Sequence, residues 1–87
     1  MNIESILKEG ISILKESKIS NPQLDSEILL SNSIKRDKKY IILNPKKLLS
    51  SEQTEIFKNL IERRRKKEPI AYIINKKEFW KDEFFVN

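Results

Sequence analysis

The chain of 87 residues is long enough for one small domain. A protein of this size buries only about 60% of the surface that its unfolded form exposes, so its core must be thin. It contains no cysteine and no histidine, which excludes disulfides, thiolate metal sites and histidine-based proton transfer. Charged residues make up 36% and hydrophobic residues 38% of the chain, with a single glycine, a composition typical of a folded helical protein rather than a disordered one.

The net charge of +5 is unevenly distributed along the chain. Residues 1–44 contribute +1 and residues 45–87 contribute +4, so we expect the second half to face any acidic partner. The sequence contains no run of apolar residues close to the roughly 18 that a membrane span requires. We therefore expect a cytoplasmic protein without a membrane partner.

Two helices are expected within the first 34 residues, because apolar residues recur there at steps of three and four. The first set is Ile3, Ile6, Leu7, Ile11 and Leu14, and the second set is Leu24, Ile28, Leu29 and Ile34. Asn2 is the expected N-cap of the first helix, and Asn21-Pro22 supplies a cap and then a proline at the first position of the second. Gly10 falls on the apolar face of the first helix, which predicts close helix packing rather than phosphate binding.

A short helix and a long helix are expected next. Residues 40–43 are assigned to a short helix that Asn44-Pro45 ends, because the residue before proline disfavours helical backbone. Ser50 and Gln53 form a capping-box pattern, which predicts the start of a long helix that continues to about Lys67. The buried stripe of this helix is expected to consist of Ile56, Phe57, Leu60 and Ile61.

Five consecutive cations, residues 63–67, close the long helix and suggest either nucleic-acid binding or a structural role. A helical wheel places Arg64 within the apolar stripe, where it packs its stem, and no aromatic residues interrupt the run as single-strand binding would require. A structural role is therefore favoured over nucleic acid. Arg63, Arg65, Lys66 and Lys67 are the candidate contacts with a protein partner.

The last residues predict a short helix over residues 70–74 and then a β-hairpin, with strands at 78–80 and 84–86. The hairpin carries four aromatic residues, Phe79, Trp80, Phe84 and Phe85. A lone hairpin is marginally stable, so these rings are expected either to fold back on the helices or to form an interface with a further domain. The expected fold is mainly α, a bundle of four to five helices over residues 1–75 with a short C-terminal β-hairpin over residues 76–87.

Five stretches of the sequence carry a resemblance to a known family. They are Asp25-Ser26-Glu27-Ile28-Leu29-Leu30, Arg63-Arg64-Arg65, Glu68-Pro69-Ile70-Ala71-Tyr72-Ile73, Glu78-Phe79-Trp80 and Phe84-Phe85-Val86. At these residues the chain resembles the N-terminal region of the peptide chain release factor glutamine methyltransferases, the HemK/PrmC family. The resemblance implies a helical domain joined by the hairpin to a methyltransferase domain that uses S-adenosyl-L-methionine (AdoMet). That domain would methylate the glutamine in the Gly-Gly-Gln loop of a class-1 release factor.

The family's catalytic Asn-Pro-Pro-Tyr motif and its glycine-rich AdoMet loop do not occur in these 87 residues. The chain by itself is therefore not expected to be an enzyme, and we assign no catalytic, cofactor-binding or metal-binding residue. The resemblance implies a domain that helps hold the release factor, with the aromatic residues of the hairpin serving the interface with the chain's own methyltransferase domain. The alternatives are a free-standing basic helical adaptor that binds RNA or a ribosomal surface, and self-association through the hairpin.

Overall fold

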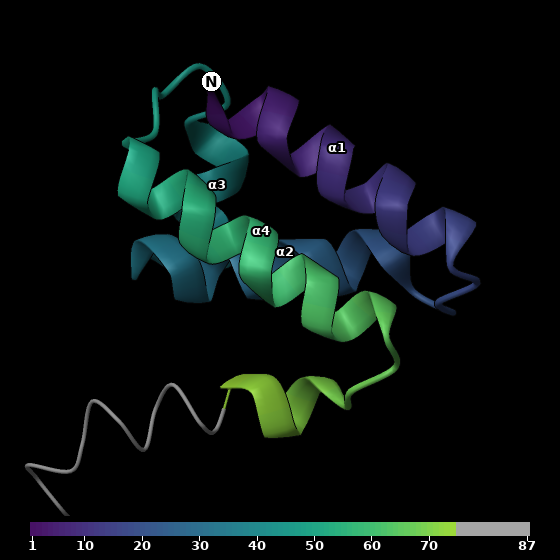
Figure 1. Ribbon diagram of the computed structural model, residues 1–87. Helices are drawn as coiled ribbons and strands as arrows, with labels where there is room; N and C mark the ends of the chain where they lie inside the picture. Colours follow the sequence, from purple (N-terminus) through teal and green to yellow (C-terminus); the bar gives the residue numbers. More distant parts are fainter. Residues whose placement is uncertain (75–87) are drawn as a thin grey trace, which may run out of the picture.

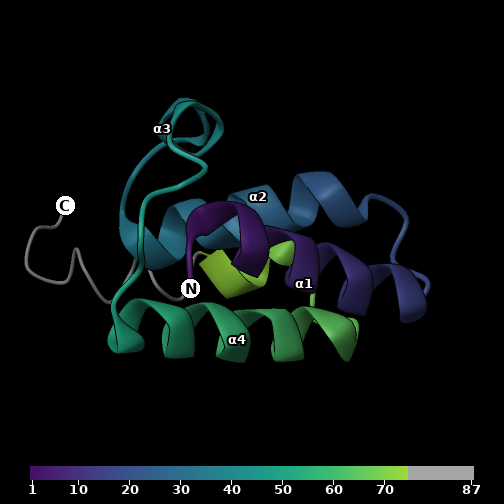
Figure 2. The same cartoon turned by 90° about the horizontal axis from the view of Figure 1, so that it is seen from above.

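The computed structural model describes residues 1–74, which form helices around one shared core (Figure 1). The helices are α1 (Ile3–Glu16), α2 (Pro22–Ile34), α3 (Lys38–Leu43) and α4 (Ser51–Arg65), and a helical segment follows over residues 70–74. Helices α1, α2 and α4 all pack against one another, whereas α3 packs mainly on α2. Figure 2 shows α3 at one edge of the molecule and α4 at the other. Segment 70–74 lies under the α2 and α4 pair, on the side opposite α1 (Figure 1).

The helix starts follow the predicted caps with one exception. The Asn2 side chain accepts a hydrogen bond from the Ser5 amide at 2.8 Å and so caps α1 as predicted. Pro22 occupies the first turn of α2 as predicted, but the side chain of Asn21 makes no capping hydrogen bond. The prediction for Asn21 is wrong because its backbone, with φ −125° and ψ 71°, departs from the extended conformation that aims a cap side chain at the first turn.

The third and fourth helices begin at side-chain caps. Helix α3 starts at Lys38, after Asp37 accepts a hydrogen bond from the Tyr40 amide at 2.9 Å, and it ends before Asn44-Pro45 as predicted. The capping box of α4 is confirmed, with both hydrogen bonds between Ser50 and Gln53 at 3.0 Å. Helix α4 ends at Arg65, slightly before the predicted position, because the backbone turns into the left-handed region at φ 76° two residues later.

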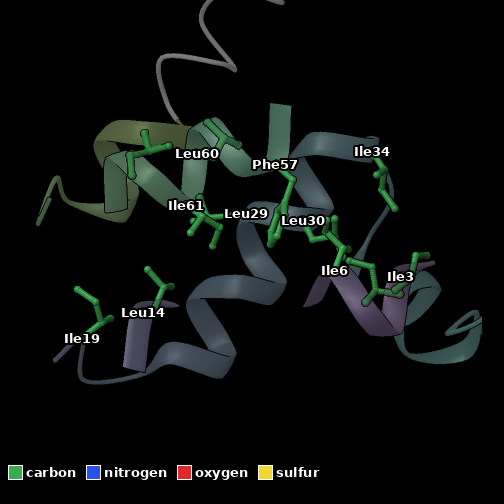
Figure 3. Packing of buried hydrophobic residues seen from close by; sticks show 12 residues of the cluster. Ile3, Ile6, Leu14, Ile19, Leu29, Leu30, Ile34, Phe57, Leu60 and Ile61 are labelled. Carbon is green, nitrogen blue, oxygen red and sulfur yellow. The ribbon is translucent and has the colours of Figure 1, made fainter. Parts of the chain in front are cut away.

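Twelve buried hydrophobic side chains form the core, and every helix contributes to it (Figure 3). They are Ile3, Ile6, Leu14, Ile19, Leu29, Leu30, Ile34, Ile41, Phe57, Leu60, Ile61 and Ile73. Phe57 of α4 reaches toward Leu29 and Leu30 of α2 in Figure 3. The predicted stripe of α4 is confirmed, since three of its four residues are buried and Ile56 packs against them.

Helix α2 differs from the prediction in the residues that it buries. Leu24, assigned to its apolar face, is 44% exposed, whereas the polar residues Asp25, Ser26 and Glu27 are buried. The helix contacts α1, α3 and α4, so it is enclosed on several sides and cannot keep its polar residues in solvent. Single-face periodicity fails for a helix in this position.

Gly10 allows α1 and α4 to approach closely, as predicted. A Cβ atom at this position would lie 2.7 Å from Cζ of Phe57 and 3.1 Å from Cδ1 of Ile61. The first distance is shorter than any ordinary carbon contact, and the ring of Phe57 is only 1% exposed. The aromatic ring therefore fills the space that a larger residue on α1 would need.

Replacing Gly10 by alanine is expected to lower the free energy of unfolding by about 1–2 kcal/mol. The added methyl group must displace a tightly packed ring, and this overpacking outweighs the roughly 1 kcal/mol that alanine gains over glycine in a helix. Urea denaturation measures the change, with the exposed Ser12→Ala on the same helix as the control. A Gly10→Ala variant more stable than the parent would show that the ring can move aside.

The predicted fold class needs one correction. Residues 1–74 contain α-helices and connecting loops but no β-strand, and their single β-bridge joins Asn2 to Leu48 in isolation. A bridge of one residue pair does not extend into a ladder of paired strands, so it does not constitute a sheet. The fold class is corrected to a helical bundle: the bundle is confirmed, and the predicted C-terminal β-hairpin is not seen in the described residues. The residues assigned to the hairpin, 76–87, lie outside the described residues.

Candidate partner-binding surface

The basic run at the end of α4 is connected to α2 through Arg64. Its Nε donates a hydrogen bond to Oδ2 of Asp25 at 3.0 Å, and its Nη1 donates to the carbonyl of Glu68 at 2.8 Å. The Arg64 side chain is 20% exposed and the Asp25 side chain 11% exposed, so both charges are largely removed from water. This confirms that Arg64 belongs to the packed side of α4. It also explains why a carboxylate is buried in α2, since a buried charge requires a partner.

Arg63 is paired with Glu68, which follows the helix in the turn toward segment 70–74. The Nε atom of Arg63 donates to Oε1 of Glu68 at 2.8 Å and its Nη2 donates to Oε2, a two-bond arrangement that suits a guanidinium and a carboxylate. This hydrogen bonding to Glu68 raises the pKa of Arg63 above its ordinary value. Arg63 and Arg64 therefore both bind Glu68 in this turn: Arg63 binds its side-chain carboxylate and Arg64 binds its backbone carbonyl.

The exposed side of the run is paired within α4 and to the end of α1. Arg65 donates two hydrogen bonds to Glu62, and Nζ of Lys66 lies 3.8 Å from the same carboxylate. The hydrogen bond from Arg65 holds the pKa of Glu62 below its ordinary value, and the charges of Arg65 and Lys66 act in the same direction. Lys67 donates a hydrogen bond to the carbonyl of Ser17.

These contacts show that the cations of the basic run already have partners within the chain. Three of the four candidate partner contacts, Arg63, Arg65 and Lys66, already face carboxylates of this chain, and Lys67 binds a carbonyl. Such pairing reduces the positive potential that a partner would meet. That these cations contact a protein partner stays a prediction. The four aromatic residues proposed for a domain interface lie outside the described residues.

The structure offers little support for cofactor or metal binding in its described part. Within residues 1–74, no three histidine, cysteine, aspartate or glutamate side chains lie together as metal ligands. The only glycine of the chain, Gly10, faces the ring of Phe57, so its backbone is not open to a phosphate or to AdoMet. Among the described residues, Gly10 therefore offers no open backbone to AdoMet. No helix in this part of the chain has the length and apolar character needed to span a membrane.

The structure has a second basic surface that was not predicted from the sequence. Summing the charge over residues 1–44 and 45–87 concealed it, because the boundary falls inside this surface. It comprises residues 35–48, which include α3 and the start of the loop to α4, and we call it the α3 lobe. Its hydrophobic residues Ile42, Leu43 and Leu48 are 60%, 67% and 70% exposed. Counting charge by helix and loop rather than by half would have revealed this lobe from the sequence.

This geometry defines a small helical domain with two basic surfaces and, in its described residues, no metal cluster. A family described as "PrmC N-terminal domain" matches residues 5–74. That match covers most of the 87 residues, and the chain belongs to this family.

Several curated relatives are similar to the chain along nearly its whole length. A "Release factor glutamine methyltransferase" from Buchnera aphidicola subsp. Schizaphis graminum is 49% identical over 80 residues, which are 92% of the chain and 28% of the relative. A protein of the same name from Aliivibrio fischeri is 38% identical with the same coverage. A "Bifunctional methyltransferase" from Rickettsia bellii is 42% identical over 86 residues, which are 99% of the chain and 16% of the relative.

The chain thus spans between about a sixth and somewhat over a quarter of the length of these relatives. No solved structure matches the chain.

Proposed function

We propose that the chain is the N-terminal domain of an AdoMet-dependent release factor glutamine methyltransferase and that it helps bind and orient the class-1 release factor. The match of the PrmC N-terminal domain family to residues 5–74 carries the proposal. The names of the Buchnera and Aliivibrio relatives support it, since both are release factor glutamine methyltransferases. In this proposal the remaining part of the protein binds AdoMet and transfers the methyl group.

The helical domain would contribute by orientation. A protein substrate must bring one glutamine side chain to the methyl donor, and holding two reactants in a productive geometry lowers the barrier by several kcal/mol. The rigid connection of α2, α4 and the following turn through Asp25, Arg64 and Glu68 suits such a role. It would transmit the position of a bound partner to the chain that follows.

The cations at the end of α4 are the contact surface that the sequence suggested for this partner. Lys66 and Lys67 are both exposed, and the Lys66 side chain is 68% exposed. Charge reversal at these two positions leaves the core intact and breaks only surface contacts, those of Lys66 with Glu62 and of Lys67 with the Ser17 carbonyl. If they contact an acidic part of the release factor, reversing their charge weakens binding through loss of attraction and added repulsion.

The test is carried out with the protein that carries this chain. We expect Lys66→Glu with Lys67→Glu to raise the KM for intact release factor about fivefold, while leaving kcat and the KM for a short Gly-Gly-Gln peptide unchanged. The matched control reverses two other exposed lysines, Lys8→Glu with Lys58→Glu. An unchanged KM for the intact release factor would remove the α4 cations as contacts, and a release factor that neither binds nor is methylated would refute the proposed function.

A further inference from the structure

The α3 lobe is one of two strongly basic segments of the chain. Residues 35–47 contain six basic residues and one acidic residue, a net charge of +5, and the run at residues 63–67 carries the same net charge. The two segments differ in their surroundings, because Glu62 and Glu68 lie directly against the run at residues 63–67.

Much of the positive charge of the α3 lobe has no carboxylate partner among residues 1–74. Lys38 lies 3.9 Å from Glu27 and Lys46 lies 3.1 Å from Glu4, which account for two of the six cations. No carboxylate within residues 1–74 lies within ion-pair distance of the other four, which are Lys35, Arg36, Lys39 and Lys47. The one acidic residue of the lobe, Asp37, is engaged in capping α3. The α3 lobe therefore offers cations to an external anion, in contrast to the end of α4.

Exposed hydrophobic side chains accompany these cations. Ile42, Leu43 and Leu48 are the three most exposed large hydrophobic residues within the described part of the chain. Ile41 on the same helix is 2% exposed and anchors α3 in the core. Ile42 and Leu43, one and two positions later, therefore point to other sides of the helix. Single exposed aliphatic residues are common, but three of them in seven residues of one basic lobe are typical of an interface.

The lobe is held in place before any partner arrives. The guanidinium of Arg36 lies 4.7 Å above the ring of Tyr40, a cation–π contact within the lobe. The start of the chain pairs with the loop after α3, since the Ile3 amide donates to the carbonyl of Lys47 at 2.9 Å and the Leu49 amide donates to the carbonyl of Met1 at 3.0 Å. A surface fixed in this way loses little conformational entropy on binding.

The position of the lobe leaves it accessible. Figure 2 shows α3 standing off the three long helices at one edge of the molecule. Segment 70–74, from which the chain continues, lies under α2 and α4 (Figure 1). Within the described part of the chain, a partner on α3 would not obstruct that segment.

We propose that the α3 lobe is the principal docking surface for the release factor, with the end of α4 contributing less, and that the lobe receives an acidic segment with exposed apolar side chains. The inference rests on the proposed function and names the surface and the chemistry of the contact. Uncompensated lysines match carboxylates, and Ile42, Leu43 and Leu48 match apolar side chains between them. The exposed hydrophobic residues are aliphatic and cannot stack on bases, and the one aromatic residue of the lobe, Tyr40, is partly buried and lies under Arg36. This combination favours a protein over single-stranded nucleic acid.

The experiment measures the affinity of purified class-1 release factor for the protein that carries this chain, by titration calorimetry. The variant Lys39→Glu with Leu43→Ser is expected to raise the Kd about tenfold or more, because it reverses one attraction and removes one apolar contact. The control Lys58→Glu with Leu24→Ser makes the same chemical changes on other surfaces and should stay within about twofold. Unchanged thermal unfolding shows that each variant is folded, and Lys47→Glu with Leu48→Ser tests the lobe independently.

Each outcome has a distinct meaning. If the parent protein does not bind the release factor, the proposed function fails and the inference fails with it. If the parent binds and both lobe variants bind as tightly as the control, the inference alone is overturned. Loss confined to Lys66→Glu with Lys67→Glu would move the docking surface to the end of α4. Lobe variants that lose affinity for a ribosomal RNA fragment or an anionic lipid vesicle, but keep their affinity for the release factor, would replace the protein partner by another anion.

Discussion

Replacing Phe57 by alanine is expected to destabilise the protein more than any other single change considered, by about 3–5 kcal/mol in the free energy of unfolding. The ring is 1% exposed, lies against Gly10 of α1 and reaches toward Leu29 and Leu30 of α2 (Figure 3). Its removal leaves a cavity where three helices meet, and a backbone built for a close α1 and α4 approach cannot collapse further to fill it.

Such a loss is large for a chain of 87 residues, whose total stability is expected to be roughly 5–10 kcal/mol. Urea denaturation followed by circular dichroism measures it, and Leu43→Ala is the matched control. Leu43 is 67% exposed, so its truncation should change stability by less than about 0.5 kcal/mol. If the two variants lost similar amounts, the packing of α1, α2 and α4 described above would be incorrect.

Asp25→Ala is expected to cost about 2 kcal/mol, because it leaves the guanidinium of Arg64 largely buried without its carboxylate. The cost is below that of a fully buried pair, since the Arg64 side chain remains 20% exposed and keeps its hydrogen bond to the Glu68 carbonyl. The same change at an exposed pair, Glu62→Ala beside Arg65, should cost less than about 0.5 kcal/mol.

A double-mutant cycle isolates the interaction of the two side chains. Asp25→Ala, Arg64→Ala and the double variant are each unfolded in urea, and we expect a coupling energy of about 1 kcal/mol or more. A coupling energy near zero would mean that the two residues act independently and that α2 is not connected to the end of α4 through them. The variants Asp25→Ala and Glu62→Ala each lose one negative charge, so a difference in their stability does not come from net charge.

The local parts of the fold were predictable from the sequence. Asn2, Pro22 and the Ser50 and Gln53 pair mark helix starts through interactions within one turn of backbone, and the structure confirms all of them. The helical wheel also placed Arg64 on the packed side of α4, because the angle between residues of one helix does not depend on the rest of the chain. These signals are read over four or five residues, which is why composition and spacing suffice.

The burial of α2 was not predictable in the same way. Its apolar residues do not form a single stripe, since Leu24 is exposed while Asp25 and Glu27 are buried. Which residues of such a helix are buried depends on the elements that pack against it, and α2 is contacted by three other helices. The pairing of the candidate partner contacts was not predictable for a related reason, because a run of cations shows its own charge but not the carboxylates that the fold brings to it.

The amino-acid sequence by itself determined the caps of α1 and α4, the packing role of the glycine at position 10 and the family to which the chain belongs. Only the tertiary structure decided which charges remain free. Asp25 and Arg64 are 39 residues apart, and their contact exists because α2 and α4 pack together. Helix caps form between residues within one turn of the same helix, whereas a charge can be paired with a residue far away in the sequence that the fold brings close. Within residues 1–74, the basic end of α4 is therefore largely neutralised, whereas four cations of the less conspicuous α3 lobe have no carboxylate partner.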